Sequence, residues 1–286
     1  MVFLDIGIMK SWILIIVGFM VCGGCVYFPN SNQRILFVAS SIPNTSFETV
    51  TLKSGIEIRT MFTGEKSSEK PLLIFVHGAP GNVLNFRKYH SDTLLTSVFN
   101  VLSYDRPGYG KRKGGKAMLR LEDQSTVINE LVHYFKTDSV FFFAHSFDGA
   151  IVLDYMARYH DAKGAVLAAT AVDPLNEKFF WFSPIGKWKL TRMLLPRKLK
   201  TTGSEKYSHV EELELLEPKL GLIDAKITAV HGTSDSIVPF QNLDFLQRKL
   251  TNSEFKSVVL EGENHFFPIR LSSFMTSLLI DLVDEK

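Results

Sequence analysis

Residues 139–149 read SVFFFAHSFDG, and this stretch decides the fold. An apolar run from Val140 to Ala144 ends at His145 and Ser146, and a pattern with helical spacing follows. Short unbroken apolar runs are typical of strands buried on both faces of a parallel sheet. A serine between such a strand and a helix lies on a sharp turn that exposes its hydroxyl group. Serine is also a favoured helix N-cap, so the motif alone fits a nucleophile or a cap.

Similar apolar runs recur on both sides of this stretch. They cover residues 71–78, 98–105, 164–170, 226–231 and 255–262, and a predicted hairpin covers 47–52 and 56–62. Helical spacing falls between them, at residues 121–135, 150–159, 243–250 and 274–283. Strands that alternate with helices predict an α/β fold with a mostly parallel sheet. Residues 174–222 are too long for an ordinary loop, and we expect a small helical cap there.

Three further motifs follow predicted strands and carry groups that a nucleophilic serine needs. His265 can act as the base, because its ordinary pKa lies near neutrality. Asp235 can orient the imidazole ring, although a loop aspartate is more often only a turn former. The backbone N–H groups of Ala79 and Phe147 can stabilise an oxyanion. Each signal is weak alone, but the carboxyl ends of parallel strands gather at one edge of a sheet.

Five motifs together resemble the α/β-hydrolase superfamily, in particular its lipase, esterase and proline-iminopeptidase-like branch. They are HGAPG (77–81), DRPGYG (105–110), AHSFDG (144–149), HGTSDSIVP (231–239) and GENHFF (262–267). The resemblance covers about residues 47–283. It implies an eight-stranded sheet with a cap after the sixth strand, and it implies no cofactor. It assigns Ser146 as nucleophile, His265 as base and Asp235 as the orienting acid, with Ala79 and Phe147 as oxyanion donors.

One residue departs from the family pattern. Asp148 stands two residues after the serine, where the family usually has glycine at a close approach of strand and helix. A carboxylate that faced a developing oxyanion would oppose the reaction. We therefore expect Asp148 to point into the first turn of the helix, where the helix dipole favours it, or toward a cationic partner.

The N-terminal 28 residues form a separate unit in the sequence. Residues 12–28 are strongly apolar, Lys10 precedes them, and Pro29 to Ser46 read as a polar linker to a domain at 47–286. Four interpretations stay open: a bacterial lipoprotein signal cleaved before Cys25, an uncleaved membrane anchor, a removed signal peptide, or a buried helix. The first two predict a membrane-associated protein whose catalytic domain is exported.

Composition narrows the classes of partner and cofactor. The net charge of +2 favours neither nucleic acid nor an acidic partner, and 45% apolar content indicates a globular chain. Cys22 and Cys25 are the only cysteines and have no second pair or nearby histidine, so we expect no metal site.

These observations predict a serine hydrolase that cleaves a carboxylic ester, thioester or amide through an acyl-serine intermediate. The aromatic residues of the cap, with Phe147 and Phe266, suggest a small-molecule substrate with an apolar acyl or aryl group. Two alternatives remain: an acyltransferase with the same triad, and a catalytically silent binding protein that keeps the fold.

Overall fold

A computed structural model of the chain describes residues 32–66, 69–110, 116–178 and 195–284. Its strands are β1 (Thr45–Thr51), β2 (Glu57–Thr63), β3 (Leu72–Val76), β4 (Asn100–Tyr104), β5 (Val140–His145), β6 (Ala162–Ala168), β7 (Lys226–Gly232) and β8 (Glu254–Leu260). Its α-helices are α2 (Asn32–Ser40), α3 (Arg87–His90), α4 (Thr93–Val98), α5 (Leu121–Phe135), α6 (Asp148–Tyr159), α8 (Arg197–Leu216), α9 (Gln241–Lys249), α10 (Phe267–Arg270) and α11 (Ser272–Asp284). Short 3-10 helices occur at η1 (Val83–Phe86), η3 (Pro174–Asn176) and η5 (Glu217–Leu222).

The strands form one eight-stranded sheet in the order β1-β2-β4-β3-β5-β6-β7-β8. The pairs β1–β2 and β2–β4 are antiparallel, whereas every pair from β4 to β8 is parallel. The parallel strands therefore end at one edge of the sheet. The predicted α/β fold with a mostly parallel sheet is confirmed.

Helices cover both faces of the sheet, and the side chains of β3 show how the core is divided. Leu72, Ile74 and Val76 pack with α5, α6 and α9, whereas Leu73 and Phe75 pack with α3, α4 and α11. Because successive residues of a strand point to opposite faces, a strand in the middle of the sheet must be apolar throughout. All five residues of β3 are buried.

The structure differs from the sequence prediction in two N-terminal segments. Part of the expected linker forms helix α2, whose Ile35 and Ala39, four residues apart, are buried against the sheet. Val98 ends α4 instead of opening a strand, and β4 begins at Asn100. No helix of the described segments is long and apolar enough to span a membrane.

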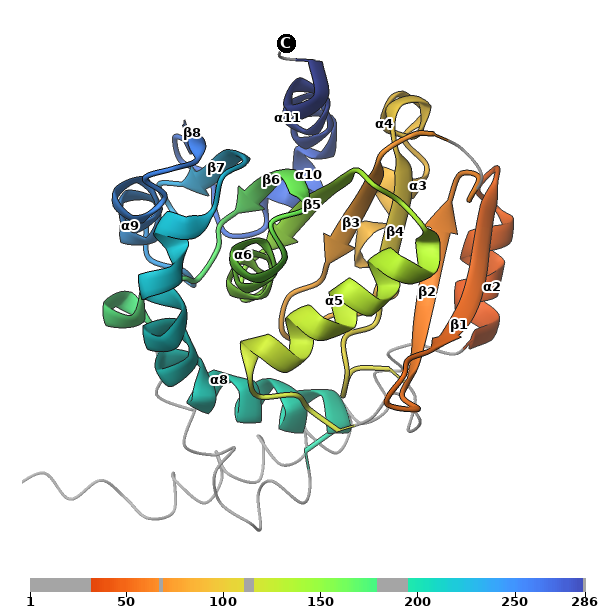
Figure 1. The fold of residues 1–286 in the computed structure, drawn as a ribbon, viewed down its shortest axis with the longest axis horizontal. Coiled ribbons are helices and arrows are strands. Elements are labelled where there is room, and N and C mark those ends of the chain that lie inside the picture. The colour runs from red at the N-terminus through yellow and green to blue at the C-terminus, as the bar shows by residue number, and fades with distance from the viewer. Residues whose placement is uncertain (1–31, 67–68, 111–115, 179–194, 285–286) are drawn as a thin grey trace, which may run out of the picture.

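The described part of the expected cap consists of η3, α8 and η5. Figure 1 shows α8 lying across one end of the molecule, beside α5 and α6. It faces the core with Leu213 and Leu216, and it also buries Glu205 and His209, two polar residues that an ordinary amphipathic helix would expose. The aromatic cluster at 179–182 and the basic residues up to 194 lie outside the described residues.

Candidate active site

Ser146 occupies the turn between β5 and α6 in a left-handed conformation, with a φ of 73°. This conformation is strained for a residue with a Cβ, and such strain gathers at functional sites. The turn is held by its backbone: the Ser146 N–H donates to Ala168 at 3.1 Å, and the Ser146 carbonyl accepts from Ala171 at 3.0 Å. These bonds explain how the chain sustains a turn that presents the serine side chain.

Gly149 allows helix α6 to approach the strand end closely. A Cβ at this position would lie 2.4 Å from the Cβ of Thr170, just after β6, a distance that packed atoms do not adopt. The glycine that the close approach requires is therefore Gly149, three residues after the serine. The expectation that position 148 is the crowded one is corrected, and a side chain fits there.

His265 and Asp235 meet as the sequence pattern predicts, from the loops after β8 and β7. The Nδ1–H of His265 donates to Oδ2 of Asp235 at 2.7 Å. The other carboxylate oxygen, Oδ1, accepts the backbone N–H groups of Ile237 at 2.8 Å and Val238 at 2.9 Å. Burial alone would raise the pKa of Asp235, but the hydrogen bond and charge of His265 with the two N–H groups lower it below its ordinary value. Asp235 therefore stays ionised and fixes the imidazole ring.

His145 brings this pair against the turn that carries Ser146. Its Nε2–H donates to the carbonyl of His265 at 2.9 Å, and the two imidazole rings lie 4.7 Å apart between centroids. Burial, with a smaller contribution from the charge of His265, lowers the pKa of His145 to about 4. His145 is therefore neutral at pH 7 and adds no charge beside His265. Within the described residues, Ser146 Oγ has no hydrogen-bond partner.

The loop after β3 lies on the other side of Ser146. A Cβ at Gly78 would come 3.5 Å from the Cβ of Ser146, so the backbone just before Ala79 packs against the serine. Neither the Ala79 N–H nor the Phe147 N–H donates to an acceptor in the described part of the chain. Two donors close to a serine, left without acceptors, are what an oxyanion site requires.

Asp148 is buried with 0% exposure, and its Oδ1 lies 3.4 Å from Nε of Arg106. The expectation of a cationic partner is confirmed. Arg106 itself was missed as a site residue, although it stands in the DRPGYG motif. An arginine directly after a buried strand is a signal for such a role, because a buried guanidinium needs acidic partners.

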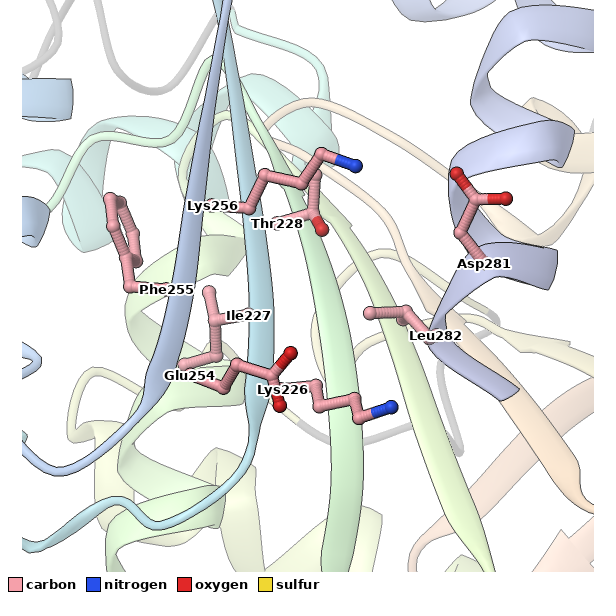
Figure 2. A pocket seen from close by; sticks show the side chains of 8 residues that line it. All are labelled: Lys226, Ile227, Thr228, Glu254, Phe255, Lys256, Asp281 and Leu282. Carbon is pink, nitrogen blue, oxygen red and sulfur yellow. The ribbon is translucent and has the colours of Figure 1, made fainter. Parts of the chain in front are cut away.

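The pocket in Figure 2 lies at the opposite end of the sheet. Its lining includes the first residues of β7 and β8 together with the end of α11: Lys226, Ile227, Thr228, Glu254, Phe255, Lys256, Asp281 and Leu282. Ser146, Asp235 and His265 all follow the carboxyl ends of strands, so this pocket is not part of their site. In the segments that the structure describes, no cluster of His, Cys, Asp or Glu could hold a metal ion. Cys25 lies outside those segments.

Comparison with known proteins places the chain among enzymes with this fold. Residues 67–214, just over half of the chain, match the model of the family described as serine aminopeptidase, S33. No curated protein matches the sequence.

Many solved structures share the fold. One is a membrane phospholipase A, a bacterial virulence factor, with 19% identity and a TM-score of 0.67, covering 96% of this chain and 100% of the other. The enol-lactonase of Burkholderia xenovorans has 17% identity and a TM-score of 0.65, covering 83% and 100%. An Exiguobacterium antarcticum esterase has 17% identity and a TM-score of 0.63, covering 84% and 100%. The chain thus belongs to the serine aminopeptidase S33 family and is an enzyme of the α/β-hydrolase superfamily.

Proposed function

We propose that this enzyme cleaves a carboxylic ester, thioester or amide through an acyl-serine intermediate on Ser146. The observation that carries the proposal is the hydrogen bond between His265 and Asp235, held against the strained turn of Ser146 by His145. The S33 match ends at residue 214, before Asp235 and His265, so the roles of these two residues rest on the geometry.

The first half of the proposed reaction forms the acyl-enzyme. His265 Nε2 takes the proton of Ser146 Oγ as that oxygen attacks the substrate carbonyl carbon. The carbonyl oxygen becomes an oxyanion that accepts the N–H groups of Ala79 and Phe147. Asp235 stabilises the imidazolium by its charge. The tetrahedral intermediate then collapses, the bond to the leaving group breaks, and His265 returns its proton to that group.

The second half releases the acid. Water attacks the acyl carbon while His265 takes one of its protons, and a second oxyanion forms at the same two N–H groups. Collapse of this intermediate breaks the bond to Ser146 Oγ, which regains its proton from His265. An acyltransferase would differ only here, because an acceptor other than water would attack the acyl carbon.

An apolar acyl or aryl group is the substrate feature that the surroundings favour. Phe147 is buried and its ring stacks on His209 of α8, with centroids 4.1 Å apart, so the exposed aromatic surface near the site comes from Phe266. Phe266, directly after the proposed base, is 54% exposed. Apolar surface beside a reacting centre gains free energy when it covers an apolar substrate group. A phospholipase, an esterase and a lactonase among the similar structures favour an ester over an amide.

A fluorophosphonate probe tests the proposed nucleophile. We expect the wild-type chain to be labelled and the Ser146→Ala variant to remain unlabelled but folded. Absence of labelling in a folded wild-type protein that binds acyl compounds would favour the silent binding protein. Release of free acid from acyl esters, compared with acyl transfer to added alcohols, then separates hydrolase from acyltransferase.

We also propose that the N-terminal segment holds the domain at 47–286 to a membrane, with Cys25 as the lipid-bearing residue if the segment is a lipoprotein signal. Helix α2 begins four residues after the apolar run, and its Asn32 accepts a hydrogen bond from Arg59 at 3.2 Å. Arg59 in turn pairs with Asp105 at the carboxyl end of β4. The chain thus enters the domain at the edge of the sheet that carries Ser146, a favourable arrangement for substrates drawn from a membrane. The intact mass of membrane-extracted protein tests lipidation at Cys25.

A further inference from the structure

Three ionisable side chains are fully buried beside Ser146. Arg106 follows β4, Asp148 opens α6, and Glu205 lies in the middle of α8. All three side chains have 0% exposure in their ion pairs. One cation therefore faces two carboxyl groups at a position with no solvent exposure. An unpaired charge is strongly disfavoured at such a position, so the state in which both carboxyl groups are ionised is high in free energy.

Glu205 takes the favourable geometry around the guanidinium. Its Oε1 accepts from Arg106 Nη1 at 2.8 Å and its Oε2 accepts from Nη2 at 3.3 Å, the paired contact in which arginine binds a carboxylate best. Oε2 also accepts the hydroxyl proton of Tyr109. With these three donors, Glu205 is the direct ion-pair partner of Arg106.

The remaining Arg106 donors serve other acceptors. Nη1 also donates to Gln124 of α5 at 2.7 Å, and Nε donates to the carbonyl of His77 at 2.8 Å. The Arg106 backbone N–H donates to Nε2 of His77 at 3.0 Å. Asp148 lies 3.4 Å from Nε, yet neither of its oxygens accepts a hydrogen bond from any described residue. It is the carboxyl group of the cluster that lacks donors.

We propose that Asp148 carries a proton in the active enzyme, and that this neutral acid is the form that the reaction at Ser146 requires. This inference rests on the proposed function. The Asp148 Oδ2 atom lies 3.9 Å from the point that a Cβ on Gly78 would occupy, beside the backbone that leads to the Ala79 oxyanion donor. A negative charge there would repel the developing oxyanion, whereas a neutral acid adds no net charge.

The groups around Asp148 support the neutral form. Burial raises the pKa of Asp148 to about 8; the charge of Arg106 lowers it in part, and the carboxylate of Glu205 raises it. Three further ionisable groups nearby are uncharged at neutral pH, because burial lowers the pKa of His77 and raises the pKa values of Tyr104 and Tyr109.

Ionisation of Asp148 would also disturb Arg106, which acts as a positioning residue. Arg106 joins His77, at the start of the oxyanion loop, to Glu205 on the cap helix. A charged Asp148 would compete with Glu205 for the guanidinium. The contacts through which Arg106 connects the loop after β3 to helix α8 would then weaken. This loss of positioning adds to the direct repulsion of the oxyanion.

The test compares the pH dependence of kcat in the full chain and in three variants, with a soluble ester as substrate. We expect wild-type kcat to fall on the order of ten- to a hundred-fold as pH rises through about 8. Asp148→Asn cannot ionise at this position, so we expect its kcat profile to stay flat as pH rises through about 8. Glu205→Gln moves the fall to lower pH, because a charge that raises the pKa of Asp148 is gone. Asp154→Asn, the same change at another buried position of α6, leaves the midpoint unchanged.

Infrared difference spectra give a readout that does not depend on catalysis. We expect a carbonyl band of a protonated carboxylic acid that disappears as pH rises through about 8, that is absent in Asp148→Asn and that persists in Asp154→Asn. Absence of the band in the wild type overturns the proton on Asp148. A band with a flat kcat profile overturns the requirement for it. Hydrolysis absent at every pH, with the band present, overturns the proposed function and leaves the protonated acid standing.

Discussion

Replacing Asp235 by asparagine changes one atom of the proposed triad and should stop the reaction while preserving the fold. The two backbone N–H groups of Ile237 and Val238 both donate to Oδ1 of Asp235. In the variant they hold the amide oxygen in that place, because an NH₂ group there would face two donors. The amide NH₂ is then directed at Nδ1 of His265, 2.7 Å from the present Oδ2.

This orientation sets the size of the effect. Nδ1 of His265 must accept a hydrogen bond from the amide, so the ring proton moves to Nε2, the atom that has to take the proton of Ser146. A triad held in the wrong tautomer loses about 10⁴-fold in kcat, which corresponds to about 5.4 kcal/mol in the activation free energy. The variant also lacks the negative charge that stabilises the imidazolium, which acts in the same direction.

The stability of the variant should change in a way that depends on pH. The pKa of Asp235 is depressed in the folded protein, so its pairing contributes stability above its ordinary pKa, and that contribution is lost as pH falls through the folded pKa. Asp235→Asn removes this dependence, and we expect its free energy of unfolding at pH 7 to fall by about 1–3 kcal/mol.

The assay measures kcat on a soluble ester together with the rate of fluorophosphonate labelling, and thermal denaturation monitors the fold. Asp92→Asn is the matched control, because Asp92 Oδ1 also accepts two backbone N–H groups and its Oδ2 also accepts one side-chain donor, Thr276. The control should keep wild-type kcat. A folded Asp235→Asn variant with more than a tenth of wild-type kcat would refute the role of Asp235 as the group that orients His265.

Two further predictions concern the frame of the site. Gly149→Ala should lower the free energy of unfolding by about 1–3 kcal/mol in urea denaturation, because its Cβ would lie 2.4 Å from the Cβ of Thr170. A second change, Thr170→Gly, should recover part of the loss, and a Gly149→Ala variant as stable as the wild type would contradict the close approach. Burial lowers the pKa of His90 to about 3, so the folded state keeps it neutral while the unfolded chain gains a proton. Its contribution to stability should therefore decline below about pH 6.5 by ~1.4 kcal/mol per pH unit, and His90→Gln should show a shallower decline; parallel slopes would count against this assignment.

Much of the frame could be predicted because it depends on short-range patterns. β3 and β5 are unbroken apolar runs in the sequence. This pattern is typical of strands that are buried on both faces of a parallel sheet. The contact between Asp235 and His265 could also be predicted, since each residue follows a strand and parallel strands end at one edge. Helix α2 escaped detection because only Ile35 and Ala39 are buried in nine residues, too few to show a helical period.

The charge cluster could not be predicted, because its contacts are long-range. Arg106 and Glu205 are 99 residues apart, and no spacing in the sequence connects them. Glu205 lies in a polar helix that carries charges of both signs, a composition typical of a solvent-exposed helix. The sequence did show that Asp148 stands where the family usually has glycine, which predicted a cationic partner. The tertiary structure identifies that partner as Arg106.

The position of Gly149 explains how the chain tolerates an acid so close to its nucleophile. Helix α6 approaches Thr170, just after β6, too closely for a Cβ at Gly149, one residue later than the family pattern suggests, whereas position 148 accommodates a side chain. A side chain there is enclosed on every side, with 0% exposure. Such a site disfavours a carboxylate whose neighbouring cation among the described residues, Arg106, is already paired with Glu205. A carboxylate at this position would repel the developing oxyanion, but burial raises the pKa of Asp148 and so favours the protonated acid. The protonated acid has no net charge that would repel the oxyanion.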